Sequence, residues 1–128
     1  MNIADIERFV GLPYEVDTLD CADLAMLVQA ELFGKHIAMP GRRQRQAAGE
    51  ATINRYSGEL AMPIDKADLR DGDVVVMHGE PKHIGTVFLL SGVAWVLHTT
   101  CELGHSLLQR LSDLPAYGLR IEGFYRWN

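Results

Sequence analysis

The sequence is poor in cysteine, with only Cys21 and Cys101 among its 128 residues. Two cysteines are too few for the disulfide framework of small secreted domains, so we interpret both as free thiols. No apolar run approaches the roughly 20 residues that cross a bilayer, and Met1 to Val10 lacks the basic and apolar regions of a signal peptide. We therefore expect synthesis in the cytoplasm, without a signal peptide, and no membrane partner.

Positive charge is also scarce. The chain has 12 Lys and Arg against 17 Asp and Glu, a formal net charge of −5, which argues against nucleic acid as the main partner. The exception is the cluster Arg42–Arg45, which we interpret as a solvated loop, with binding of substrate carboxylates as the alternative. Phosphate-loop, G-x-G-x-x-G and G-x-S-x-G motifs are missing from the sequence, so we expect no cofactor.

What the sequence does contain begins with helical patterns. Apolar residues at helical spacing predict a short helix over residues 3–10 and a second helix over Cys21–Phe33. Asp20 is the expected N-cap of the second helix, and Gly34 is the expected residue at its end. Residues 47–56 are a weaker helical candidate, because their apolar periodicity is poor.

The second half of the chain has the pattern of β-strands. Runs rich in β-branched and aromatic residues predict strands over residues 74–77, 83–90, 93–99 and 120–127. Ser91-Gly92 predicts a tight hairpin between the second and third of these strands. Helices followed by antiparallel strands indicate an α+β fold, with N-terminal helices packed on a small antiparallel β-sheet. The length fits a single domain over residues 1–128.

Cys21 is the candidate nucleophile because it is predicted to open a helix. A helix N-terminus stabilises the thiolate and can lower a thiol pKa from about 8.5 to roughly 3.5–7.5; the alternative is a core cysteine. His83 and His98 lie on the two strands of the predicted hairpin, where His83 would pair near residue 100 and His98 near residue 85. That spacing lets His98 orient His83 as a base. We interpret the other histidines as surface or core residues: His36, His78 and His105.

Four segments resemble the NlpC-type papain-like cysteine peptidases, in that family's order. They are Leu12-Pro13-Tyr14 with Asp20-Cys21-Ala22-Asp23-Leu24, then Leu69-Arg70-Asp71-Gly72-Asp73-Val74-Val75, His83-Ile84-Gly85-Thr86-Val87 and Val96-Leu97-His98-Thr99. The resemblance implies a papain-like fold and a thiol protease that hydrolyses amide bonds in peptidoglycan stem peptides. It also implies that Cys21 is the nucleophile, His83 the base and His98 the orienting residue. Tyr14 would donate a hydrogen bond to the oxyanion.

The chain departs from the family pattern in two places. Ala22-Asp23 stands where the family has Ser-Gly, and Met39-Pro40-Gly41-Arg42 stands where it has Leu-Pro-Arg. These departures affect the expected substrate specificity more than the chemistry. Compact members resemble the peptidase domains of bacteriophage tail proteins. The resemblance therefore implies a cell-wall peptide as substrate and phage tail proteins as partners, with virion association or lysis as the routes out of the cell.

Three alternatives stay open at the level of the sequence. A zinc site could use the histidines 78, 83 and 98 with Glu80 or His105, although their spacing does not match a helical H-E-x-x-H motif, and we expect no metal. A non-catalytic phage tail module could keep the same fold. A papain-like acyltransferase would use the same three residues, because the shape of the pocket selects the acyl acceptor.

Overall fold

The computed structural model describes residues 1–15, 19–37, 60–79 and 82–128. The predicted helix over residues 47–56, the cluster Arg42–Arg45 and Glu80 lie outside these residues. In chain order, the elements are α1 (Ile3–Ile6), the 3₁₀-helix η1 (Glu7–Phe9), α2 (Cys21–Phe33), β1 (Ala61–Ile64), η2 (Lys66–Asp68), β2 (Val74–Met77), β3 (His83–Leu90), β4 (Val93–His98), β5 (Leu107–Arg110), η3 (Leu111–Tyr117) and β6 (Ile121–Trp127).

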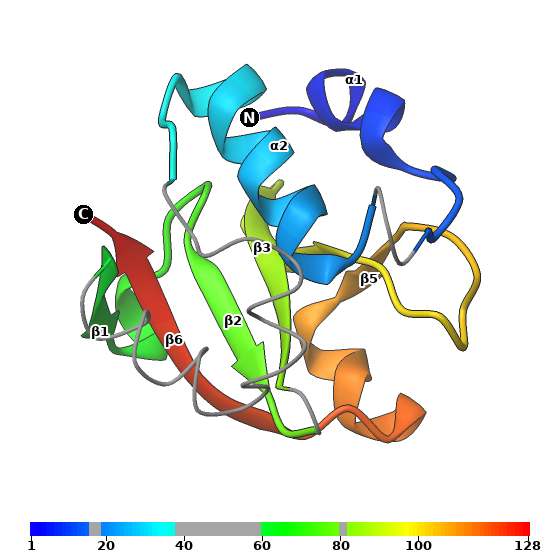
Figure 1. Ribbon diagram of the computed structural model, residues 1–128. Helices are drawn as coiled ribbons and strands as arrows, with labels where there is room; N and C mark the ends of the chain where they lie inside the picture. The colour runs from blue at the N-terminus through cyan, green and yellow to red at the C-terminus, as the bar shows by residue number, and fades with distance from the viewer. Residues whose placement is uncertain (16–18, 38–59, 80–81) are drawn as a thin grey trace.

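The strands of the described residues form one six-stranded sheet in the order β1-β6-β2-β3-β4-β5. Every neighbouring pair is antiparallel. Helix α2 crosses one face of this sheet and contacts β3, while α1 lies near it at the same side of the molecule (Figure 1). The predicted α+β class, with helices on a small antiparallel sheet, is therefore confirmed. Among the described helices, none is both long enough and apolar enough to cross a membrane.

Helix α2 has the predicted bounds because both of its ends are capped locally. The Asp20 side chain accepts a hydrogen bond from the backbone of Asp23, and the Asp23 side chain accepts one from the backbone of Asp20. This reciprocal capping box satisfies two N–H groups that a helix start otherwise leaves without partners. At the other end, Gly34 adopts a left-handed φ of 65°, which stops the helix.

The core lies on both faces of the sheet. On one face, α2 packs through apolar side chains against the central strands, and the buried members include Leu24, Val28, Ile84, Phe88 and Leu97. On the other face, η3 covers a second apolar cluster, whose buried members include Val75, Met77, Val87, Val96 and Leu114. Each fully buried side chain of this kind contributes about 1.5–3 kcal/mol. The sheet is thus packed on both faces, by α2 on one and by η3 on the other.

The hairpin between β3 and β4 follows its prediction. Ser91 and Gly92 both have positive φ, 52° and 78°, as a two-residue turn of the tight hairpin type requires. The register runs from Leu90 opposite Val93 to Thr86 opposite Leu97. Counted on by one residue, this register puts Gly85 beside His98, as predicted, and a Cβ at Gly85 would lie 3.1 Å from Cβ of His98.

Several elements differ from the predictions: η2 and η3 were not predicted, and β4 and β6 are each one residue shorter than predicted. The first helix is shorter: α1 has four residues and continues as η1, with Ile6 and Phe9 buried. Strands β1 and β5 were not predicted, and both lie at edges of the sheet. An edge strand tolerates Pro63, because the outward side of its backbone needs no ladder hydrogen bond. Short edge strands carry little periodic signal, since each contributes only two side chains to a face.

Candidate active site

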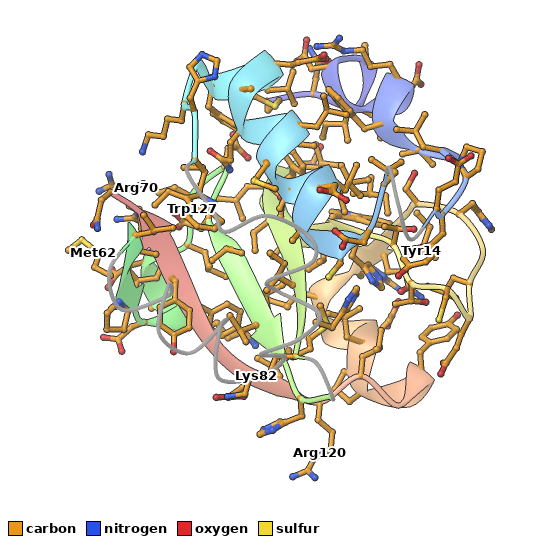
Figure 2. The ribbon with its side chains drawn as sticks, viewed as in Figure 1. Tyr14, Met62, Arg70, Lys82, Arg120 and Trp127 are labelled. Atoms are coloured by element: carbon orange, nitrogen blue, oxygen red, sulfur yellow. The ribbon has the colours of Figure 1, made fainter. Side chains whose placement is uncertain are left out.

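A cavity of about 350 Å³ opens beside the start of α2. Its lining contains three of the four predicted site residues, Tyr14, Cys21 and His83, together with Lys82 and Cys101. Figure 2 shows Tyr14 beside the first turn of α2, and Trp127 at the opposite edge of the molecule, on the last strand. Residues that are far apart in the sequence therefore meet at one end of the helix, next to the strand that begins with His83.

Cys21 is the first residue of α2 and is partly buried. The positive end of the helix dipole favours a negative charge at this position, which is the environment that activates a thiol. Cys101 lines the same cavity but is exposed and lies outside any helix. The two cysteines are not joined in a disulfide, as predicted.

His83 and His98 are joined by a hydrogen bond. His83 is the first residue of β3 and His98 the last residue of β4. Their ring atoms Nε2 of His83 and Nδ1 of His98 lie 2.8 Å apart. The other ring nitrogen of His98, Nε2, lies 2.7 Å from Oε1 of Gln109 on β5. The structure thus extends the predicted pair to a chain of three side chains on three adjacent strands.

Gln109 was missed by the sequence interpretation. Its strand is short and has no local signature, and only the pairing of β5 with β4 brings its amide to the buried ring of His98. His98 is only 1% exposed, so this amide supplies a partner where water has little access. Without such a partner, the N–H group of the buried imidazole would lose its hydrogen bonds to water with nothing in exchange, which destabilises the folded state.

Burial and the neighbouring imidazole of His98 lower the pKa of His83 to about 3. Burial also lowers the pKa of His98, although the hydrogen bond to Gln109 opposes this shift. Both rings are therefore neutral at neutral pH. A neutral ring at the cavity is able to accept a proton from a thiol, and the resulting thiolate would raise the pKa of the ring that took it.

These lowered pKa values predict a loss of stability on acidification. Below about pH 6.5 the unfolded chain protonates its histidines, whereas native His83 stays neutral to about pH 3. The unfolded state then binds more protons, so its free energy falls relative to the native state by about 1.4 kcal/mol per pH unit for this group. Urea unfolding at pH 7.5 and pH 5 measures the effect. His83→Gln removes the titrating ring, and an equally steep pH dependence in that variant would contradict the assignment.

Gly85 lets β3 pack closely against β4 beside His98. A Cβ atom at this position would lie 2.5 Å from Cγ1 of Val96 and 3.1 Å from Cβ of His98. We expect Gly85→Ala to push β4 away from β3, at a cost of about 1–3 kcal/mol in the free energy of unfolding. The same displacement should slow alkylation of Cys21 by iodoacetamide.

Gly123 on β6 provides the matched control, because a Cβ there would meet Tyr125 only at an ordinary 3.5 Å. Gly123→Ala should therefore change stability and alkylation little. Equal effects of the two substitutions in urea unfolding would show that steric crowding at Gly85 is not the cause of the lost stability.

Tyr14 is held at the cavity by the loop that precedes β5. Backbone and side-chain hydrogen bonds join Leu12 to the buried Ser106, with N···O distances of 2.8 Å. The Tyr14 N–H donates to the carbonyl of Gly104 at 3.0 Å. Burial, followed by the negative charge of Asp20, raises the pKa of Tyr14 above its ordinary value. The phenol therefore stays protonated and can donate a hydrogen bond.

A charged cluster at the cavity was also missed. Lys82, directly before His83, is 5% exposed, and its ammonium group pairs with Glu122 on β6. The second oxygen of Glu122 lies 3.6 Å from Nδ1 of His78, which is exposed and lines the cavity. In the part of the chain that the structure describes, no group of three or more His, Cys, Asp or Glu side chains is arranged to hold a metal ion.

No protein-family model matches this chain, and no curated protein matches it in sequence. The interpretation of the cavity therefore depends on its own residues. Its components come from the loop before α2, the first turn of α2, and the ends of β3 and β4. What these side chains offer together is a thiol at a helix start, a neutral imidazole held by a second one, and a protonated phenol.

Proposed function

We propose that this protein is a papain-like cysteine hydrolase of the NlpC type, with Cys21 as nucleophile and His83 as base. The observation that carries the proposal is the shared cavity: the thiol at the start of α2 and the imidazole at the start of β3 line the same hollow. The hydrogen bond from His83 to His98 supplies the orienting member of the triad. A nucleophile, a base and an orienting group in this order meet the requirements of covalent catalysis.

The proposed reaction proceeds through a thioester. The Cys21 thiol gives its proton to His83, and the sulfur attacks the amide carbonyl carbon, so that an S–C bond forms and the oxygen becomes an oxyanion. His83 then gives the proton to the leaving nitrogen as the C–N bond breaks. Water then loses a proton to His83 and attacks the thioester carbonyl. The S–C bond breaks, the carboxylic acid is released, and His83 returns its proton to the sulfur of Cys21.

Tyr14 is the proposed donor to the oxyanion. Its phenol stays protonated and lines the cavity beside Cys21. The backbone N–H of Cys21 is a further proposed donor, whereas the N–H of Asp23 in the same turn is bonded to the Asp20 side chain. Loss of one such donor costs about a hundredfold or more in rate in enzymes of this kind.

The proposed substrate is a stem peptide of peptidoglycan, as the resemblance of the sequence to NlpC-type peptidases implies, and phage tail proteins are the proposed partners. Incubation of the full chain with purified peptidoglycan, followed by mass spectrometry of the released fragments, tests this. Soluble peptides with one new free amine and one new carboxyl group are the expected products. Their absence, with a folded protein and a Cys21 thiol that reacts no faster than Cys101, would favour a non-catalytic module.

The same assay separates hydrolysis from acyl transfer. With an added amine such as glycine amide, an acyltransferase would give amide products. Each would be heavier than the corresponding carboxylic acid by the mass of the amine minus that of water. A hydrolase gives carboxylic acids in both reactions. If the amine adduct were the main product, the protein would be an acyltransferase that uses the same nucleophile and base.

A further inference from the structure

His83, His98 and Gln109 form a chain of hydrogen bonds behind the cavity, and Gln109 determines which nitrogen donates in each bond. Its carbonyl oxygen Oε1 lies 2.7 Å from Nε2 of His98, and Nδ1 of His98 lies 2.8 Å from Nε2 of His83. An amide oxygen can only accept a hydrogen bond, so Nε2 of His98 must carry a hydrogen. A neutral imidazole has one N–H, which leaves Nδ1 of His98 as an acceptor.

The next link follows from the same rule. Because Nδ1 of His98 accepts, Nε2 of His83 must donate, and the remaining nitrogen of His83 has an unshared electron pair. We propose that Gln109 is a positioning residue that fixes the tautomers of both histidines and leaves Nδ1 of His83 as the proton acceptor at the cavity. The tautomer assignment stands by itself, and its role in catalysis depends on the proposed function.

The opposite orientation would disable the base. If Gln109 presented its NH₂ group to His98, Nε2 of His98 would accept and Nδ1 would donate to Nε2 of His83. His83 would then carry its hydrogen on Nδ1 and could not take a proton there from a thiol. One amide on an edge strand therefore decides whether the ring at the cavity is a base or a donor.

A neutral amide also suits this position better than a carboxylate. His98 is 1% exposed, and a carboxylate beside it would favour its protonated form. A positive charge on His98 would disfavour a second one on His83, which must become positive when it accepts the thiol proton. With Gln109 in place, His98 stays neutral when His83 becomes positive, and Nδ1 of His98 accepts a hydrogen bond from Nε2 of His83.

Direct observation of the ring nitrogens tests the proposal. Long-range ¹H–¹⁵N spectra of the ¹⁵N-labelled full chain at pH 7.5 report which nitrogen of each histidine carries hydrogen. The expected result is hydrogen on Nε2 in both His83 and His98. Hydrogen on Nδ1 of His83 would overturn the proposal, and this measurement needs no variant.

Two substitutions at Gln109 sharpen the test. Gln109→Met keeps a similar volume without the acceptor, and we expect both rings to populate mixed tautomers. Alkylation of Cys21 by iodoacetamide should then slow at least about tenfold, because part of the roughly hundred- to ten-thousandfold contribution of a base is lost. Gln109→Glu restores an acceptor, so it should restore the tautomers but shift the histidine titrations to higher pH. Exposed His105 is the internal control, and its signals should not change.

The outcomes separate this inference from the proposed function. Unchanged tautomers of His83 and His98 in Gln109→Met would show that Gln109 does not determine them, and this conclusion is independent of the proposed function. The expected tautomers together with a Cys21 that reacts no faster than Cys101 in the native chain would support the role of Gln109 in the hydrogen-bond chain. That second result would count against the cysteine hydrolase instead.

Discussion

Replacing Cys21 by alanine abolishes the release of peptides from peptidoglycan, with a loss of at least about a thousandfold in turnover, because the step that forms the thioester has no sulfur. The fold should survive, since alanine is a good helix former and Cys21 is only partly buried at the first position of α2. Mass spectrometry of the fragments measures the loss, and circular dichroism confirms the fold.

Cys101→Ser is the matched control, because this thiol lines the same cavity but is exposed and lies outside a helix. It should retain turnover within a few-fold of the native chain. A loss in Cys101→Ser as large as in Cys21→Ala would mean that the nucleophile has been assigned to the wrong cysteine. Loss of peptide release in Cys21→Ala alone supports the thiol at the helix start.

Replacing His83 by alanine has the second largest expected effect, a loss of about a hundred- to ten-thousandfold in turnover. The thiol of Cys21 then loses its proposed base, although the helix start still favours the thiolate. Rapid alkylation of Cys21 at pH 6, expected for the native chain, should be lost in the same variant. Rates of labelling at pH 6 and pH 8 measure this without any knowledge of the substrate.

His105→Ala is the control for this experiment. His105 is exposed, and its ring is bonded to the carbonyl of Leu103, so its removal should not change the labelling of Cys21. If His83→Ala labelled as fast as the native chain at pH 6, the cavity would not contain a working pair of thiol and base. The hydrogen-bonded histidines would then serve the stability of the sheet.

Local signals account for the parts of the fold that the predictions place correctly. The caps Asp20 and Gly34 determine the bounds of α2, and the turn Ser91-Gly92 determines the register of β3 and β4. These features depend on neighbours a few residues away, which is why a single sequence reveals them. The first helix is predicted too long because Val10 fits the apolar spacing but is exposed and lies past the end of η1.

The missed features depend on contacts between distant segments. Strand β5 has four residues, and Gln109 becomes a partner of His98 only when β5 pairs with β4. Lys82 meets Glu122 across 40 residues of sequence. Such pairs leave no periodic trace in the chain, because sheet order and not local propensity brings them together.

The order of amino acids alone specifies where the thiol stands on its helix and where the two histidines stand on their hairpin. Caps and turns act over a few residues, so the neighbouring residues are enough to set these positions. The folded chain adds two things that the order of residues does not contain: Tyr14, Cys21 and His83 share one cavity, and Gln109 lies behind His98. The reason is that packing of α2 on the sheet, together with pairing at its edge, sets distances between residues that the chain itself leaves far apart.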